Sequence, residues 1–163
     1  AVAMGYNALF AYDLTGEGDI LKGKVIGPLV KGAVSTDCRA MCVDPDGTVW
    51  AGLMATLPGQ PQLPRLVSYT PGDEAPIDHG PVAIGNPDYT DFKGPYQHGV
   101  HRPFGDHLVS RYVVMGVCAA KDGTVYLTTL YPFTVHAVKI PKVADLIRKH
   151  GGKTGEELKA ELK

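Results

Sequence analysis

An Asp-Gly turn flanked by strand-forming residues occurs twice in this sequence, and it limits the folds that the chain can adopt. Residues 42–53 read Cys-Val-Asp-Pro-Asp-Gly-Thr-Val-Trp-Ala-Gly-Leu, and residues 118–129 read Cys-Ala-Ala-Lys-Asp-Gly-Thr-Val-Tyr-Leu-Thr-Thr. Asp-Gly accepts the positive φ of a tight turn, and the flanking Val, Thr and aromatic residues favour extended backbone. Each copy therefore predicts a strand, a tight turn and a second strand.

A second element also recurs, with apolar and polar residues alternating as a half-buried strand requires. Residues 8–13 match residues 65–70 and, more loosely, residues 134–139. The first two copies are followed by residues 25–27 and 83–85, each of which predicts a short edge strand. The repeating unit is then four antiparallel strands, and the chain is predicted to be all-β.

This unit resembles a blade of a β-propeller. It is most similar to the NHL, streptogramin-lyase and SMP-30/gluconolactonase group, whose inner hairpin runs apolar-x-apolar-Asp-x-Asp-Gly-x-Val-Trp/Tyr, as residues 42–50 do. The resemblance implies a β-propeller segment of four-stranded antiparallel blades over residues 1–141. Asp-Gly hairpins also occur in β-sandwiches and β-barrels, which are the alternative architectures.

The unit length divides the chain into parts of blades. Residues 1–27 are expected to end one blade, residues 28–85 to form a full blade, and residues 111–141 to start the last, with an inserted loop at 86–110. About two and a half blades do not close a ring, which takes about 4–8. The chain is therefore expected to be the C-terminal part of a larger propeller, or one chain of a ring completed by another; the partners would be the remaining blades.

Residues 142–163 have a different character. Apolar residues at helical spacing fill 142–150, two glycines follow, and Thr154 with Glu157 forms a capping-box pattern. We predict a short α-helical C-terminal tail, acting as a clamp, as a frayed end or as a partner-binding helix.

Charge and composition exclude several classes of function. Sixteen Lys and Arg against 17 Asp and Glu leave a net charge of −1, which provides no basic face for nucleic acid. No apolar run is long enough to span a membrane, so a soluble chain is expected. Three cysteines make no disulfide framework. Cys38 and Cys42 are four residues apart, a spacing that some metal sites use, but they are expected to be small buried apolar residues. The compartment stays undetermined; a periplasmic or secreted location would require a signal peptide that has been removed.

The insertion concentrates residues with metal-binding and acid-base chemistry. His98, His101 and His107 lie close together, with Asp106 beside the last. Imidazoles and carboxylates bind divalent transition metals, so this set is a candidate site for a divalent metal ion. General acid-base catalysis, substrate contact and a solvated or packing role are the alternatives.

Other candidates for binding a ligand lie at the predicted inner strands, near the mouth of the central channel: Asp37, Arg39, Arg111 and Tyr112. Arg102, in the insertion, is a further candidate ligand-binding residue. Asp37 and Arg39 are close enough in sequence to pair with each other. Trp50 and Tyr126 occupy matching positions in the two hairpins and are predicted to lie in the core between blades.

Two functions follow. The first is a binding face at the channel mouth of a propeller, for a small molecule or a protein. The alternative is part of a metal-dependent hydrolase or lyase, with the loop at 86–110 over its active site, so whether the chain is an enzyme stays open. The resemblance does not imply metal-dependent catalysis for this chain, because in those families the metal ligands come from several blades around the channel.

Overall fold

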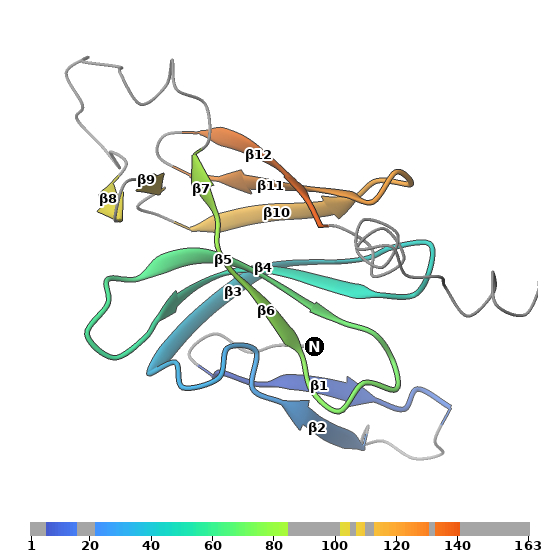
Figure 1. Cartoon of the computed structure of the whole chain (residues 1–163). Coiled ribbons are helices and arrows are strands. Elements are labelled where there is room, and N and C mark those ends of the chain that lie inside the picture. The colour runs from blue at the N-terminus through green and yellow to red at the C-terminus, as the bar shows by residue number, and fades with distance from the viewer. Residues whose placement is uncertain are drawn as a thin grey trace, which may run out of the picture.

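The computed structural model describes residues 6–15, 22–84, 102–104, 107–109, 113–130 and 133–140. Within these residues the chain is all-β, with strands in antiparallel sheets and no helix, which confirms the predicted class (Figure 1). No helix in this part is long and apolar enough to cross a membrane. The helical tail predicted for 142–163 lies outside the described residues.

The central sheet has four strands in the order β3-β4-β5-β6. Their bounds are Ser35–Val43, Val49–Thr56, Leu63–Tyr69 and Ile77–Pro81. The first Asp-Gly turn joins β3 to β4, and Gly47 adopts a φ of +87° there, a conformation that favours glycine. This part of the sequence forms the four-stranded antiparallel unit that the repeats predict.

Smaller sheets lie on either side of it. On one side β1 (Leu9–Tyr12) pairs with β2 (Gly23–Gly27). On the other side the order is β10-β11-β12, with bounds Val114–Ala119, Thr124–Thr129 and Thr134–Lys139. The second Asp-Gly turn joins β10 to β11, so both predicted hairpins form.

The outer strand of the central sheet differs from the prediction. Residues 83–85 were expected to fill that place, but β6 pairs with β5 instead. β7 (Ala83–Ile84) belongs to a separate sheet with β8 (Arg102–Phe104) and β9 (His107–Val109), in the order β7-β9-β8. The sequence of β6 has no alternating apolar pattern. Polar contacts hold it to β5 instead: Asp78 pairs with Arg65, and His79 bonds to Ser68.

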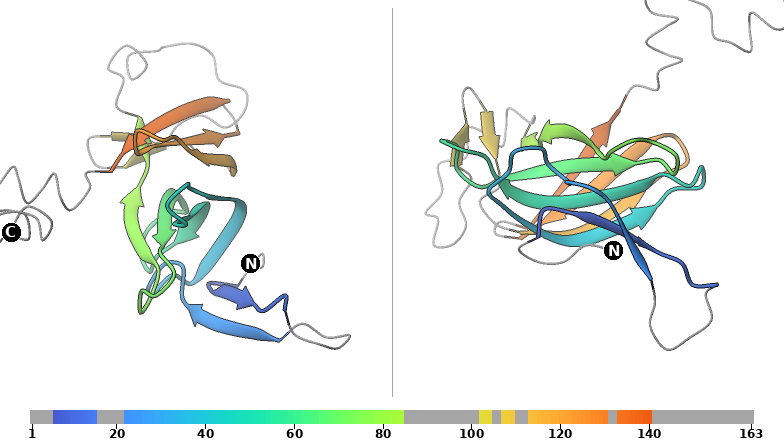
Figure 2. Two further views of the ribbon diagram at one scale, coloured as in Figure 1. Left: turned by 90° about the vertical axis from the view of Figure 1, so that its right-hand side faces the viewer. Right: turned by 90° about the horizontal axis from the view of Figure 1, so that it is seen from below.

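The sheets β1–β2, β3–β6 and β10–β12 stack face to face (Figure 2). One apolar cluster fills the space between β1–β2 and the central sheet, and a second fills the space between the central sheet and β10–β12. The second contact is very close at Gly52, where a Cβ atom would lie 2.6 Å from Cγ1 of Val114. Glycine at this position therefore sets how closely β4 and β10 approach.

Trp50 lies in this second cluster with 9% of its surface exposed, which confirms its predicted core position. The same prediction is wrong for Tyr126, which is 40% exposed. Its neighbours Val125 and Leu127 face the central sheet, so the alternation of a strand turns Tyr126 to the opposite face. Among the described residues no sheet covers that face.

Candidate ligand-binding site

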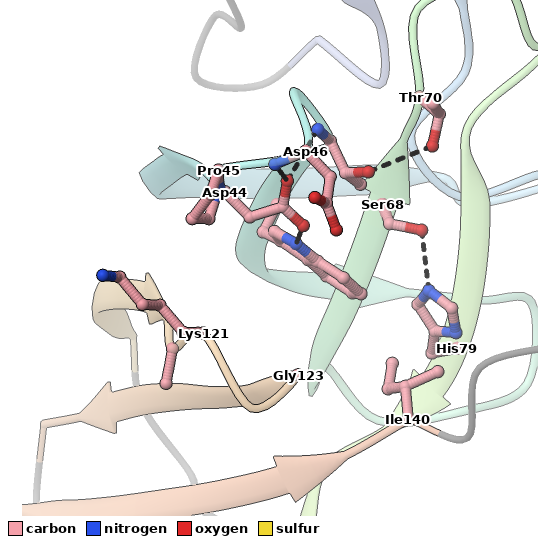
Figure 3. Close-up of a pocket in the computed structure, with 12 residues that line it drawn as sticks. Asp44, Pro45, Asp46, Ser68, Thr70, His79, Lys121, Gly123 and Ile140 are labelled. Atoms are coloured by element: carbon pink, nitrogen blue, oxygen red, sulfur yellow. Dashed lines mark hydrogen bonds between the residues drawn. The ribbon is translucent and has the colours of Figure 1, made fainter.

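A pocket of about 390 Å³ opens between the central sheet and β10–β12, at the ends of the sheets that carry the Asp-Gly turns (Figure 3). We call it the inter-sheet pocket. Both sheets contribute to its wall, so it exists only because they pack together. Its lining residues are Asp44, Pro45, Asp46, Thr48, Trp50, Ser68, Thr70, His79, Ala120, Lys121, Gly123 and Ile140.

Asp44 fixes the shape of the pocket wall. Its Oδ1 accepts hydrogen bonds from the backbone N–H groups of Asp46 and Thr48, both at 2.9 Å. Its Oδ2 accepts one from Nε1 of Trp50 at 3.0 Å (Figure 3). One carboxylate thus holds both the hairpin turn and the orientation of the indole, so Asp44 is a positioning residue.

Trp50 and His79 form an aromatic layer in the wall. Their rings stack with centroids 5.5 Å apart and an interplanar angle of 30°. Nε2 of His79 shares a hydrogen bond of 2.8 Å with Oγ of Ser68 (Figure 3). Burial lowers the pKa of His79, and the neighbouring Asp78 carboxylate offsets only part of this effect. Burial therefore favours the neutral form of the imidazole.

Charged and polar groups from both sheets complete the pocket. Asp46 comes from the turn of the central sheet, and Lys121 comes from the turn between β10 and β11. The hydroxyls of Thr48 and Thr70 lie 3.2 Å apart. Ile140 adds an apolar surface next to β12 (Figure 3). The pocket therefore offers opposite charges, hydroxyls and an aromatic wall to a bound molecule.

The contact between Ser68 and His79 has the form of a nucleophile and its base, but its surroundings do not favour catalysis. Ser68 is buried. In the part of the chain that the structure describes, no carboxylate bonds to the second ring nitrogen of His79, as an orienting group would. The N–H groups of Asp46 and Thr48 are taken by Asp44 and do not form an oxyanion hole. The geometry favours binding.

Of the predicted channel residues, the structure describes the side chains of Asp37 and Arg39, and neither lines this pocket. Asp37 and Arg39 are on β3 and bond to each other, with Nε of Arg39 2.9 Å and 3.0 Å from the two carboxylate oxygens. This confirms the predicted pair, and Asp37 raises the pKa of Arg39. Arg102 begins β8, but its side chain lies outside the description, as do Arg111 and Tyr112 entirely.

The predicted metal ligands are largely outside the described residues. His98, His101 and Asp106 are not described, and only the backbone of His107 is, in β9. In the described ranges no group of three or more His, Cys, Asp or Glu side chains is placed to hold a metal ion. The metal site stays a prediction.

Sequence reasoning missed Ser68 and His79 as site residues. His79 lies in residues 77–81, whose sequence has no alternating pattern and predicts no strand. The repeat at 65–70 predicts a strand through Ser68 but no function for it. The hairpin motif at 42–50 includes Asp44 as a residue of the turn. A histidine in the segment between two predicted strands is a sequence signal for His79, whereas its bond to Ser68 depends on the pairing of β5 with β6.

Comparison with protein-family models, with curated proteins and with solved structures finds no match. The geometry of the pocket and the repeated sheets are therefore the observations that bear on function.

Proposed function

We propose that this chain is a segment of a β-propeller that binds a small polar molecule in the inter-sheet pocket. The observation that carries the proposal is the composition of the pocket wall. An aromatic layer, hydroxyls and opposite charges converge there from two neighbouring sheets. Its volume of about 390 Å³ falls in the range of about 300–1,000 Å³ typical of small-molecule sites.

The propeller part of the proposal is supported by the repetition of the sheets. Two sheets carry the same Asp-Gly-Thr-Val-aromatic hairpin at the same end and stack face to face. Blades of a propeller pack in this way around a channel. The remaining blades, in the same parent chain or another, are the proposed partners.

The proposed site differs from a channel-mouth site. The Asp37–Arg39 pair is satisfied internally, so it presents no unpaired charge to a ligand. The metal-dependent hydrolase or lyase depends on side chains of residues 86–110, and no observation on the described residues favours it.

Trp50 provides a direct test because it is the only tryptophan in the chain and lines the pocket. The purified chain would be titrated with a panel of amino acids, monosaccharides and nucleosides while tryptophan emission is recorded. We expect one class to change the emission saturably. Lys121→Ala and Ser68→Ala should weaken that binding about tenfold or more, because each removes a polar contact.

Lys31→Ala, an exposed change between β2 and β3, is the matched control and should leave the titration unchanged. Arg39→Ala separates the pocket from a channel-mouth site. Binding that is lost in Arg39→Ala but retained in Lys121→Ala and Ser68→Ala would contradict the pocket as the site, as would a panel that produces no saturable change.

A further inference from the structure

The sheet β10–β12 has an exposed apolar face on the side away from the central sheet. Met115, Tyr126 and Val135 are 47%, 40% and 61% exposed. The register places Cys118, Tyr126 and Ala137 in one row across the three strands, and this row carries no charged side chain. Exposed apolar patches of this kind mark interaction surfaces.

The repeat shows what kind of surface this is. Cys118, Tyr126 and Thr128 occupy the repeat positions of Cys42, Trp50 and Gly52 in the central sheet. There, Cys42 and Trp50 pack against apolar residues of β10–β12, and Gly52 approaches Val114. The Trp50 face of the central sheet and the Tyr126 face of β10–β12 are therefore equivalent in the repeat. The first is covered by β10–β12, whereas the second is open among the residues that the structure describes.

The opposite end of the stack also has an open face. Leu9 and Ile26 of the sheet β1–β2 pack toward the central sheet. Strand alternation turns Tyr12 and Val25 to the other side, where they are 46% and 61% exposed. Within the described ranges, no sheet covers this side. The two open faces lie at opposite ends of one stack (Figure 2).

We propose that a second copy of this chain docks on the β10–β12 face with its β1–β2 face. Inside the chain, two neighbouring sheets pack through different faces: the central sheet contributes its Trp50 face, and β10–β12 contributes the face opposite Tyr126. Head-to-tail contact between copies repeats that established interface, whereas contact between two β10–β12 faces would not. Such a heterologous contact produces a ring if the rotation closes and a filament if it does not. The inference rests on the repeated sheets and is independent of the inter-sheet pocket.

Sedimentation velocity of the whole chain over a wide concentration range tests it. The wild-type protein should associate beyond a monomer. Tyr126→Lys and Val25→Lys each place a charge in one of the faces and should each weaken self-association by roughly 100-fold, because the charge would be buried without a partner. Both positions are exposed, so circular dichroism and Trp50 emission should show unchanged folding.

Mixing the two variants gives the decisive result. Tyr126→Lys keeps an intact β1–β2 face and Val25→Lys keeps an intact β10–β12 face, so an equimolar mixture should form a dimer and stop there. A Val25→Lys protein that still dimerises alone would overturn the head-to-tail arrangement. A wild-type chain that stays monomeric at every concentration would overturn self-association, and retained ligand titration in that sample would leave the pocket standing.

Discussion

The imidazole of His79 lies against the indole of Trp50, with centroids 5.5 Å apart, although the two residues come from strands at different positions in the central sheet. The stack couples the hairpin at β3–β4 to the outer strand β6. It also places the only tryptophan of the chain beside a titratable group.

This arrangement predicts how stability depends on pH. Burial lowers the pKa of His79 in the folded chain below its ordinary value of 6.5, so the unfolded chain binds the proton more tightly. Stability is therefore fully present above the unfolded pKa and is lost as the pH falls through that value toward the lower folded pKa. His79→Phe keeps an aromatic ring and removes this titration. Thermal unfolding followed by tryptophan emission should show that the variant loses less stability than the wild type as the pH is lowered. Parallel pH profiles would mean that His79 is not the group responsible.

Asp44 is predicted to control both the turn and the indole. Asp44→Ala removes the acceptor of three hydrogen bonds and should destabilise the fold by about 1–3 kcal/mol. Acrylamide should then quench Trp50 more strongly, because its indole N–H has lost its partner. Asp122→Ala is the control in the second hairpin, where the Asp122 carboxylate accepts bonds from the backbone N–H and the hydroxyl of Thr124. It should leave the quenching unchanged; equal quenching in both variants would contradict the role of Asp44.

Gly52 is predicted to be required for the close contact of two sheets. Gly52→Ala would place a methyl group 2.6 Å from Val114 and should cost about 1–3 kcal/mol in denaturant unfolding. Val114→Ala should also destabilise the chain, because Val114 is fully buried. The free energy of unfolding that the double variant loses should be smaller than the sum of the two single losses, since the smaller side chain at position 114 makes room for the new methyl group. Additive losses would mean that the two residues do not meet.

The cysteines should differ in reactivity. Burial raises the pKa of the Cys38 thiol to about 11, whereas Cys118 is exposed. Because the thiolate is the reactive form, iodoacetamide at pH 8 should alkylate Cys118 first and Cys38 only after unfolding in guanidinium. Mass spectrometry of the digested protein measures both. Early modification of Cys38 in the native chain would contradict its place in the core.

Local backbone chemistry made much of the fold predictable. Asp-Gly turns and alternating strands identified both hairpins, β2, β5 and β12, because tight turns and strand periodicity depend on residues close together in sequence. The outer strand β6 was not predictable in this way. Its residues Asp78 and His79 are polar, and only their partners on β5 explain why they lie in a sheet.

The candidate site divides in the same manner. The sequence by itself determined the hairpin in which Asp44 and Trp50 meet, since both residues belong to one short turn motif. Only the tertiary structure decided that His79 and Ser68 join them, that Lys121 faces them from the next sheet, and that Tyr126 is exposed while Trp50 is buried. The physical reason is that burial depends on which sheet covers a face, and that is a contact between parts of the chain far apart in sequence.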